Sequence, residues 1–295
     1  MLTIDTAPAL RREVAQWRRE GLRVGFVPTM GNLHAGHYSL VAIARRHADR
    51  VVASVFVNPT QFGPNEDYSR YPRTLERDRD GLAAAGCDLL FAPSVETMYP
   101  FGAGNTVKVH VPVVTEPLEG AFRPGHFDGV ATVVTRLFNL VQPDVAVFGR
   151  KDYQQLLTIR RLVADLSLPI DIVAGDTLRE AGGLAMSSRN QYLSEVDRER
   201  AATIHRTLLR MRDSVAAGTP VDIVEAEAAA ALDAAGFRTD YAAIRRADDL
   251  APAGLTPFAG LVALIAARLG TTRLIDNLPF VGFTDENDGD VRHSQ

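Results

Sequence analysis

The chain has 295 residues, of which 46% are apolar and 23% are charged, as in ordinary soluble globular proteins. This length predicts roughly two domains. The net charge of -4 gives no bulk attraction to nucleic acid or to an anionic membrane, and no apolar run approaches the ~20 residues of a membrane span. A single cysteine, Cys87, excludes an intrachain disulfide framework. With no apolar signal core in residues 1–20, these features predict a cytoplasmic protein.

The first two thirds of the chain alternate between apolar runs and amphipathic segments. Strands are expected at residues 22–27, 51–57, 88–92, 145–148 and 170–173. Helices are expected at residues 8–20, 74–85, 127–141 and 152–166, with one more that starts at an HAGH segment and ends near His47. A short alternating strand at 107–111 is expected outside the main sheet. This order predicts an α/β fold with a mainly parallel sheet and helices on both faces.

The pattern changes after Arg189. Ser194 is a candidate helix cap, followed by a long helix to residue 217 and an Ala-rich helix at 221–235. Short strands follow at 240–245, 261–267 and 272–275. We therefore expect a first domain at 1–185, a smaller α+β domain at 186–283 and a polar, disordered tail at 284–295.

Residues 26–37 read FVPTMGNLHAGH and form the most informative segment. Pro28 is expected to end a strand, Gly31 to permit a tight turn, and His34 and His37 to share one face of a helix start. The N-terminus of a helix binds phosphate, and imidazoles placed there can donate hydrogen bonds to phosphate oxygens. Two other interpretations remain open, a zinc-binding pair or structural histidines, although a zinc site needs further ligands.

Two more loops carry cations. Residues 148–155 read FGRKDYQQ, where Lys151 can hold phosphate and Asp152 can cap a helix or hold Mg²⁺ through water. Residues 182–190 read GGLAMSSRN, where two hydroxyls and Arg189 can close over a triphosphate. An ordinary solvated lysine and a plain interdomain linker are the competing interpretations.

Amide side chains follow the second and fourth strands. Asn58 and Gln61 lie in an NPTQF segment, and Gln155 lies one helical turn beyond Lys151. Amides bind hydroxyls and carboxylates without adding charge, although NPTQF alone is also compatible with a structural turn. Because the carboxyl ends of parallel strands meet at one edge of a sheet, loops 28–37, 58–63 and 149–155 are expected to lie together.

Six segments in this order resemble the pantothenate synthetases, the AMP-forming pantoate–β-alanine ligases. They read VPTMGNLHAGH, FVNPTQF, YPRT, FGRKDYQQL, REAGGLAMSSRNQYLS and RLGTTRLIDN, and they span residues 27–277. HAGH and MSSR alone resemble the two ATP signatures of the wider nucleotidyltransferase superfamily, which includes class I aminoacyl-tRNA synthetases. NPTQF and KDYQQ narrow the resemblance to the pantoate enzymes.

The resemblance implies a two-step reaction. The carboxylate of pantoate attacks the α-phosphate of ATP and gives pantoyl adenylate and pyrophosphate, and β-alanine then displaces AMP to give pantothenate. It also implies Mg²⁺ with the nucleotide, a homodimer, and a Rossmann-like N-terminal domain with a small C-terminal lid. Another adenylyl or cytidylyl transferase acting on a different small acid or phosphate, and a catalytically silent nucleotide-binding module, are the alternatives.

The resemblance also implies roles for individual residues. His34, His37 and Lys151 would be catalytic, with His37 as the proton donor, and Asp152 would be the candidate metal ligand. The implied ATP-binding residues are Met30, Gly31, Asn32, Leu33, His34, Ala35, Gly36, His37, Gly149, Arg150, Lys151, Asp152, Leu178, Met186, Ser187, Ser188 and Arg189. The implied residues for pantoate and β-alanine are Gln61, Gln155, Met30 and Asn58. Arg150 stands where the family often has an acidic residue, and Gly182 where it often has Asp.

Overall fold

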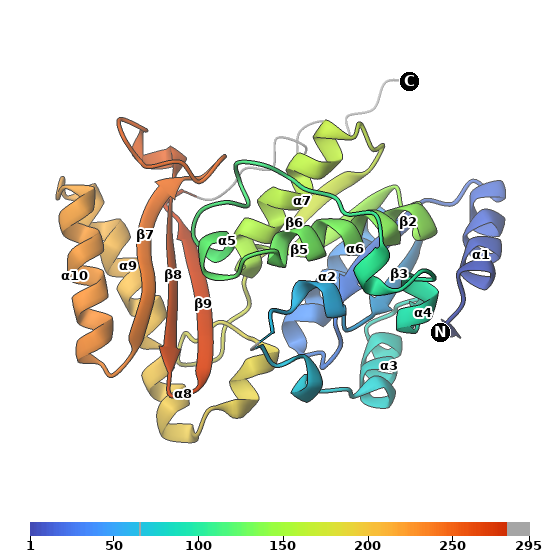
Figure 1. Ribbon diagram of the computed structural model, residues 1–295, viewed down its shortest axis with the longest axis horizontal. Helices are drawn as coiled ribbons and strands as arrows, with labels where there is room; N and C mark the ends of the chain where they lie inside the picture. Colours follow the sequence, from blue (N-terminus) through green and yellow to red (C-terminus); the bar gives the residue numbers. More distant parts are fainter. Residues whose placement is uncertain (65, 282–295) are drawn as a thin grey trace. The chain divides into compact units, whose positions relative to one another are not determined.

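The computed structural model describes residues 1–64 and 66–281, and the chain divides between Ser194 and Glu195 into two compact units (Figure 1). The division therefore lies beyond the predicted boundary at 185/186. Residues 186–194 stay with the first unit because the buried Asn190 amide donates to Glu180 Oε1 at 2.8 Å and to the Ala185 carbonyl at 3.0 Å. The predicted tail at 284–295 lies outside the described residues.

The first unit contains a six-stranded sheet in the order β1-β4-β3-β2-β5-β6, and every pairing is parallel. Its strands are β1 (Leu2–Ile4), β2 (Val24–Thr29), β3 (Arg50–Val55), β4 (Leu89–Phe91), β5 (Val145–Gly149) and β6 (Asp171–Gly175). Its α-helices are α1 (Ala7–Arg19), α2 (Ala35–His47), α3 (Leu75–Ala84), α4 (Val95–Met98), α5 (Glu119–Phe122), α6 (His126–Val141) and α7 (Tyr153–Asp165). The predicted mainly parallel α/β sheet is confirmed, and the unpredicted β1 adds an edge strand.

Helices cover both faces of this sheet, as its apolar strands predict. Successive strand residues point to opposite faces, so Phe26 packs in the cluster formed with α1, α6 and α7, whereas Val27 packs in the cluster formed with α2 and α3. Both side chains are 0% exposed. Burial on both faces explains why the central strands read as continuous apolar runs.

Three local expectations are wrong. Pro28 does not end its strand, because the pairing of β2 with β3 continues to Thr29. The pairing with β5 stops at Phe26, so the missing N–H of proline weakens the pairing of β2 only on the β5 side. Residues 107–111 form no strand, because the Val109 N–H donates to Thr132 Oγ1 of α6 at 2.9 Å instead of to a neighbouring strand. The long helix after Ser194 is interrupted at Ala202, where ψ is -12°.

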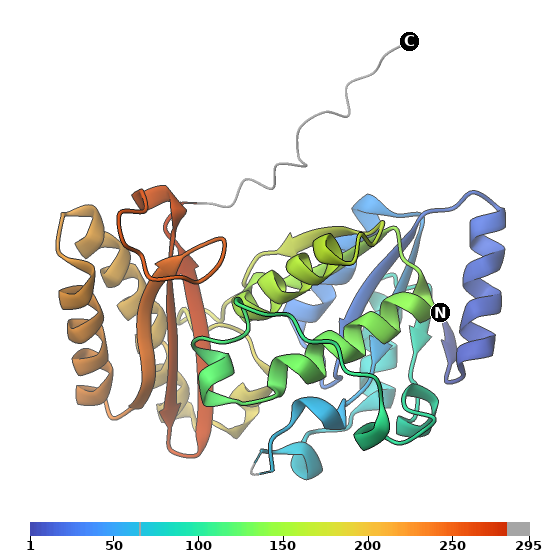
Figure 2. The same cartoon turned by 45° about the horizontal axis from the view of Figure 1, so that its top comes forward.

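The second unit is built from a three-stranded antiparallel sheet in the order β7-β8-β9. Its elements are α8 (Glu195–Ala201), α9 (Thr203–Ala216), α10 (Val221–Ala234), β7 (Arg238–Arg246), β8 (Leu261–Leu269) and β9 (Thr272–Pro279). Figure 1 and Figure 2 both show α9 and α10 side by side along this sheet. The predicted smaller α+β unit is confirmed. Within residues 1–64 and 66–281, no helix has the length and apolarity needed to cross a membrane.

The direction of the winding in the first unit changes between β2 and β5. The chain places β3 and β4 on one side of β2, and β5 and β6 on the other. The loops that follow β2 and β5 therefore diverge, and they leave a crevice at the carboxyl ends of these strands. Parallel sheets of this kind bind ligands at such a point.

Candidate active site

A cavity of about 230 Å³ lies at the carboxyl ends of β2 and β5, within the first unit. It brings together the three predicted loops and the MSSR segment. The predicted site residues that line it are Met30, His34, Gly36, His37, Asn58, Gln61, Gly149, Lys151, Asp152, Gln155, Leu178, Met186, Ser187, Ser188 and Arg189. The lining does not include Gly31, Asn32, Leu33, Ala35 or Arg150.

The rings of His34 and His37 lie in contact at the start of α2, with centroids 4.1 Å apart and planes tilted by 51°. The Gly36 N–H donates to His34 Nδ1 at 3.1 Å, and the His34 N–H donates to His37 Nδ1 at 3.3 Å. Both rings thereby cap free backbone donors of the helix. Because each Nδ1 accepts a hydrogen bond, each neutral ring carries its proton on Nε2.

Both histidines stay neutral near pH 7. Burial and the neighbouring Lys151 lower the pKa of His34 to about 4. Burial and His34 lower the pKa of His37 to about 3. The pair therefore offers two N–H donors to a ligand in the cavity without two extra positive charges.

Positive charge comes from Lys151 and Arg189, and both line the cavity. Lys151 Nζ lies 3.7 Å from Asp152 Oδ1, and Arg189 Nη2 lies 3.3 Å from Asp67 Oδ1. Burial raises the pKa of the Asp152 carboxyl, but Lys151 and Arg189 together outweigh it and hold this pKa below its usual value. Two cations and two imidazole N–H groups suit a polyphosphate.

Gln61 is held in place by the turn that carries it, η1 (Pro59–Gln61). The buried Asn58 amide donates to Gln61 Oε1 at 3.1 Å and to the Gly129 carbonyl at 3.1 Å. Asn58 Oδ1 accepts from the Tyr99 hydroxyl at 2.7 Å. Asn58 therefore uses its polar atoms to orient Gln61, whose Nε2 donates to Met30 Sδ at 2.9 Å.

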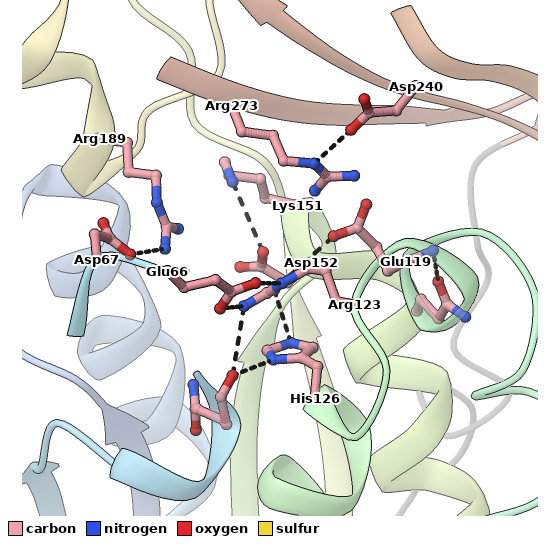
Figure 3. A network of polar contacts seen from close by, with 12 residues as sticks. Glu66, Asp67, Glu119, Arg123, His126, Lys151, Asp152, Arg189, Asp240 and Arg273 are labelled. Atoms are coloured by element: carbon pink, nitrogen blue, oxygen red, sulfur yellow. Dashed lines mark hydrogen bonds and ion pairs between the residues drawn. The ribbon is translucent and has the colours of Figure 1, made fainter. Parts of the chain in front are cut away.

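Sequence reasoning missed a polar network beside Gln61 (Figure 3). Arg123 makes a two-pronged ion pair with Glu66, with N–O distances of 2.6 and 2.7 Å, and Arg123 Nη1 donates to His126 Nε2 at 3.0 Å. His126 Nδ1 in turn donates to the Gln61 carbonyl at 2.8 Å. Burial and Arg123 lower the pKa of His126 to about 4, so this ring is neutral too.

A signal for this network was present in the sequence. Arg123 and His126 belong to an RPGH segment at the start of α6. Both residues line the cavity. Their partner Glu66 lies far away in the chain, and no periodic pattern connects the two segments.

Arg150 and the turn at 31–33 lie behind the cavity wall. Arg150 Nη1 pairs with Asp176 Oδ1 at 3.0 Å. Backbone N–H groups of Asn32 and Leu33 donate to the buried Asp78 carboxylate. These residues therefore hold the lining segments from outside the cavity.

The cavity offers few side-chain donors for the metal that the resemblance implies. Within residues 1–64 and 66–281, no group of three or more His, Cys, Asp or Glu side chains is arranged to hold a metal ion. Two carboxylates, Asp152 and Asp176, line the cavity. Mg²⁺ bound to a nucleotide takes most of its ligands from phosphate and water and needs only one or two carboxylates, so the donors present fit it.

Known proteins match almost the full length of the chain. The family model described as pantoate-beta-alanine ligase matches residues 2–279. Pantothenate synthetase from Xanthomonas euvesicatoria is 64% identical over 278 residues, which cover 94% of this chain and 99% of that protein. The protein of the same name from Stenotrophomonas maltophilia is 63% identical with the same coverage.

Solved structures give the same answer. A crystal structure of pantothenate synthetase from Thermus thermophilus matches with a TM-score of 0.88 and 52% identity, covering 96% of this chain and all of that one. Pantoate-beta-alanine ligase from Francisella tularensis, complexed with Beta-gamma ATP and Beta-alanine, matches with a TM-score of 0.79 and 34% identity over 95% of this chain and 98% of that one. With the HAGH, KDYQQ and MSSR segments at one cavity, these matches show that the chain belongs to the pantoate-beta-alanine ligase family.

Proposed function

We infer that this protein condenses pantoate with β-alanine at the expense of ATP, through pantoyl adenylate, and releases AMP and pyrophosphate. The observation that carries the proposal is the composition of one cavity. Phosphate-binding groups line it beside two amides, Gln61 and Gln155, that suit a small hydroxy acid. Family membership and the names of the relatives support the same reaction.

In the first step, a carboxylate oxygen of pantoate forms a bond to the α-phosphorus, and the bond to the pyrophosphate oxygen breaks. Negative charge grows on oxygens of the phosphoryl groups during this step. We propose that Lys151 and the Nε2–H groups of His34 and His37 stabilise it, since all three residues line the cavity. Because its ring is neutral near pH 7, His37 is proposed to donate an Nε2–H hydrogen bond to a phosphate oxygen and not to give up the proton itself. Arg189 is proposed to hold two phosphate oxygens at once.

In the second step, the amine of β-alanine attacks the acyl carbon of the adenylate. The C–N bond forms, the proton that the amine loses goes to solvent, and AMP leaves with the oxygen that came from pantoate. Gln61 is proposed to hold pantoate and to lie near β-alanine. A lid formed by the second unit is proposed to exclude water, because an acyl adenylate hydrolyses easily.

The proposal also includes a magnesium ligand, an oligomeric state and a cellular location. Asp152 would hold Mg²⁺ together with phosphate oxygens, and the ion would neutralise charge on the leaving pyrophosphate. We propose a homodimer in the cytoplasm, as the resemblance implies. Sedimentation should then give about twice the 32.1 kDa of one chain; a monomer at assay concentrations would reject the dimer.

The test is pyrophosphate release from ATP and Mg²⁺ in the presence of pantoate, with and without β-alanine. Steady release that depends on β-alanine, with AMP and pantothenate as products, is the expected result. Release that depends on a different small acid or phosphate while pantoate is inert would indicate another nucleotidyltransferase. Tight ATP binding with no turnover on any acceptor would indicate a silent binding module.

A further inference from the structure

We propose that Asp78, on α3, is a positioning residue for adenylate formation, because its buried carboxylate fixes the turn that presents His34 to the cavity. The proposal rests on the proposed function for its kinetic consequences. Asp78 does not line the cavity. It acts through the backbone of residues 31–33.

The buried carboxylate of Asp78 accepts three short hydrogen bonds. Its side chain is 0% exposed. Oδ2 accepts from the Asn32 N–H at 2.8 Å and from Thr74 Oγ1 at 3.0 Å, while Oδ1 accepts from the Leu33 N–H at 2.8 Å. Each carboxylate oxygen therefore holds one backbone donor of the same turn.

The turn has a backbone conformation that needs such support. Gly31 has φ 86° and Asn32 has φ 53°, so two successive residues are left-handed, and Asn32 is not a glycine. The N–H groups of Asn32 and Leu33 in this turn converge on one carboxylate and so make a small anion-binding nest. Here the anion is Asp78, which is part of the protein.

Because the Asp78 carboxylate fills the nest, the turn at residues 31–33 has a different role from the one that the resemblance implies. The resemblance implies that Gly31, Asn32 and Leu33 bind ATP. However, none of these residues lines the cavity, and the N–H groups of Asn32 and Leu33 already donate to Asp78. The nest serves the structure of the loop. The ligand is therefore bound by the residues that follow this turn, beginning with His34.

Asn32 extends the support to the MSSR segment. Its Oδ1 accepts from Arg77 Nη2 at 2.6 Å, and its carbonyl accepts from Ser188 Oγ at 3.0 Å. Arg77 and Asp78 are neighbours on α3. Arg77 thus holds the turn through the Asn32 side chain, and Asp78 holds it through the backbone. The HAGH segment follows this turn directly, and the MSSR segment is bonded to it through Ser188, so both depend on it.

The test compares Asp78→Asn with Asp80→Asn, an identical change on the same helix at a carboxylate that is 74% exposed. An asparagine has one acceptor oxygen, so its NH₂ group would face one of the two backbone N–H donors. We expect Asp78→Asn to lower kcat for pyrophosphate release about 10²-fold, the scale of a small misplacement of catalytic groups. The KM for pantoate should change far less, because Gln61 and Gln155 lie on other segments.

Two direct readouts separate positioning from a general loss of structure. Amide hydrogen exchange should accelerate at Asn32 and Leu33 in Asp78→Asn at a temperature where the rest of the first unit keeps its protection. Nitrogen NMR of labelled histidine should show that His34 and His37 lose their uniform Nε2–H tautomer. If Asp78→Asn is not recovered folded, Asp78→Glu, which displaces the carboxylate by one methylene, takes its place with the same expectations.

The outcomes distinguish the two proposals. A wild-type kcat in a folded Asp78 variant, or unchanged exchange at both amides, overturns the positioning role. A wild-type protein that releases no pyrophosphate with pantoate overturns the proposed function, while the exchange and NMR readouts still decide the role of Asp78. An Asp80→Asn variant as slow as Asp78→Asn would also contradict the proposal, since it would point to the charge of α3 instead of the clamp.

Discussion

His34 and His37 illustrate how a few hydrogen bonds decide the chemistry of a side chain. Each Nδ1 accepts a backbone N–H, which caps α2 and leaves Nε2–H free to donate. Gly36 is required beside them, because a Cβ there would lie 2.9 Å from His34 Cε1. Lys151 then supplies the compact positive charge that neutral rings lack.

Removal of that charge gives the first prediction. Lys151→Ala should lower the rate of adenylate formation by roughly 10²–10³, the usual scale for losing one preorganised charge-stabilising group. The matched control is Lys108→Ala, because Lys108 is the other lysine of the chain and is exposed. Pre-steady-state pyrophosphate release measures the step, and a near-normal rate in Lys151→Ala would reject its role.

The neutral histidines give a prediction for stability against pH. The pKa values of His34, His37 and His126 are lowered to about 4, 3 and 4, against an ordinary 6.5. Between these values the unfolded chain binds protons that the folded chain does not, so the free energy of unfolding should fall as the pH falls from about 6.5 toward 4. Thermal unfolding across this range measures the slope.

A variant isolates one contribution to that slope. His126→Asn keeps an N–H donor for the Gln61 carbonyl but removes the titrating ring. The slope of the free energy of unfolding against pH, measured near pH 5, should fall by the amount that up to one bound proton contributes. The free energy of unfolding at pH 7 should change less. The same slope in the variant and the wild type would show that His126 is not held neutral by the fold.

Sequence reasoning found the residues whose chemistry is written in short motifs. HAGH, KDYQ and MSSR carry His34, Lys151 and Arg189, and the structure brings all three to one cavity. It missed Asp78, which stands in no recognisable pattern. It also missed the role of Arg123, because RPGH does not indicate the distant partner Glu66. A buried acidic residue in an otherwise charged helix segment, RDRD, gives no signal of its own.

At the level of elements, the approach of α6 to η1 sets the position of Gln61. A Cβ on Gly129 would lie 2.4 Å from the Thr60 carbonyl oxygen and 2.7 Å from Gln61 Cα. The helix backbone therefore packs directly against the turn, and the Asn58 amide bonds to the Gly129 carbonyl across this contact. Glycine at 129 is needed for close approach and not for an unusual φ.

This packing predicts the effect of one methyl group. Gly129→Ala should push the 59–61 turn away from α6 and raise the KM for pantoate, with a loss of stability of about 1–3 kcal/mol from overpacking. Gly104→Ala, where a Cβ meets nothing within 4 Å, is the control. If Gly129→Ala leaves both the KM and the unfolding midpoint unchanged, the contact does not position Gln61.

Periodicity predicted most elements of the sheet because its strands are buried on both faces and its helices show one apolar side. It failed where tertiary contacts outweigh local pattern. Residues 107–111 alternate like a strand, but the Val109 N–H donates to Thr132 of α6. Pro28 stays paired with β3 on one side of its strand. The three-residue β1 was missed because it is too short to show a period and is stabilised by pairing with β4.

At the scale of the whole molecule, the residues that line the cavity all belong to the first unit, Met1–Ser194. Binding of ATP to this unit alone should therefore stabilise it. The proposed lid role of the second unit concerns water exclusion and adenylate lifetime, and not the formation of the phosphate-binding groups. These two contributions can be measured apart.

The corresponding prediction concerns ligand-linked stability. ATP and Mg²⁺ at a free concentration about 100 times Kd should raise the free energy of unfolding by about 2.7 kcal/mol, with slower hydrogen exchange in α2 and β5. Chelation of Mg²⁺ should reduce this shift, and Lys151→Ala should reduce it further. Stabilisation that is confined to the second unit would contradict the assignment of the site.

The central claim is that the carboxylate of pantoate is activated as an acyl adenylate, and transfer of its oxygen tests this most directly. Pantoate labelled with ¹⁸O in both carboxylate oxygens is converted with ATP and β-alanine, and the products are analysed by mass spectrometry. The proposed mechanism predicts one ¹⁸O in AMP and one in the amide carbonyl of pantothenate, with none in pyrophosphate. Unlabelled AMP, or ADP and labelled inorganic phosphate as products, would contradict it.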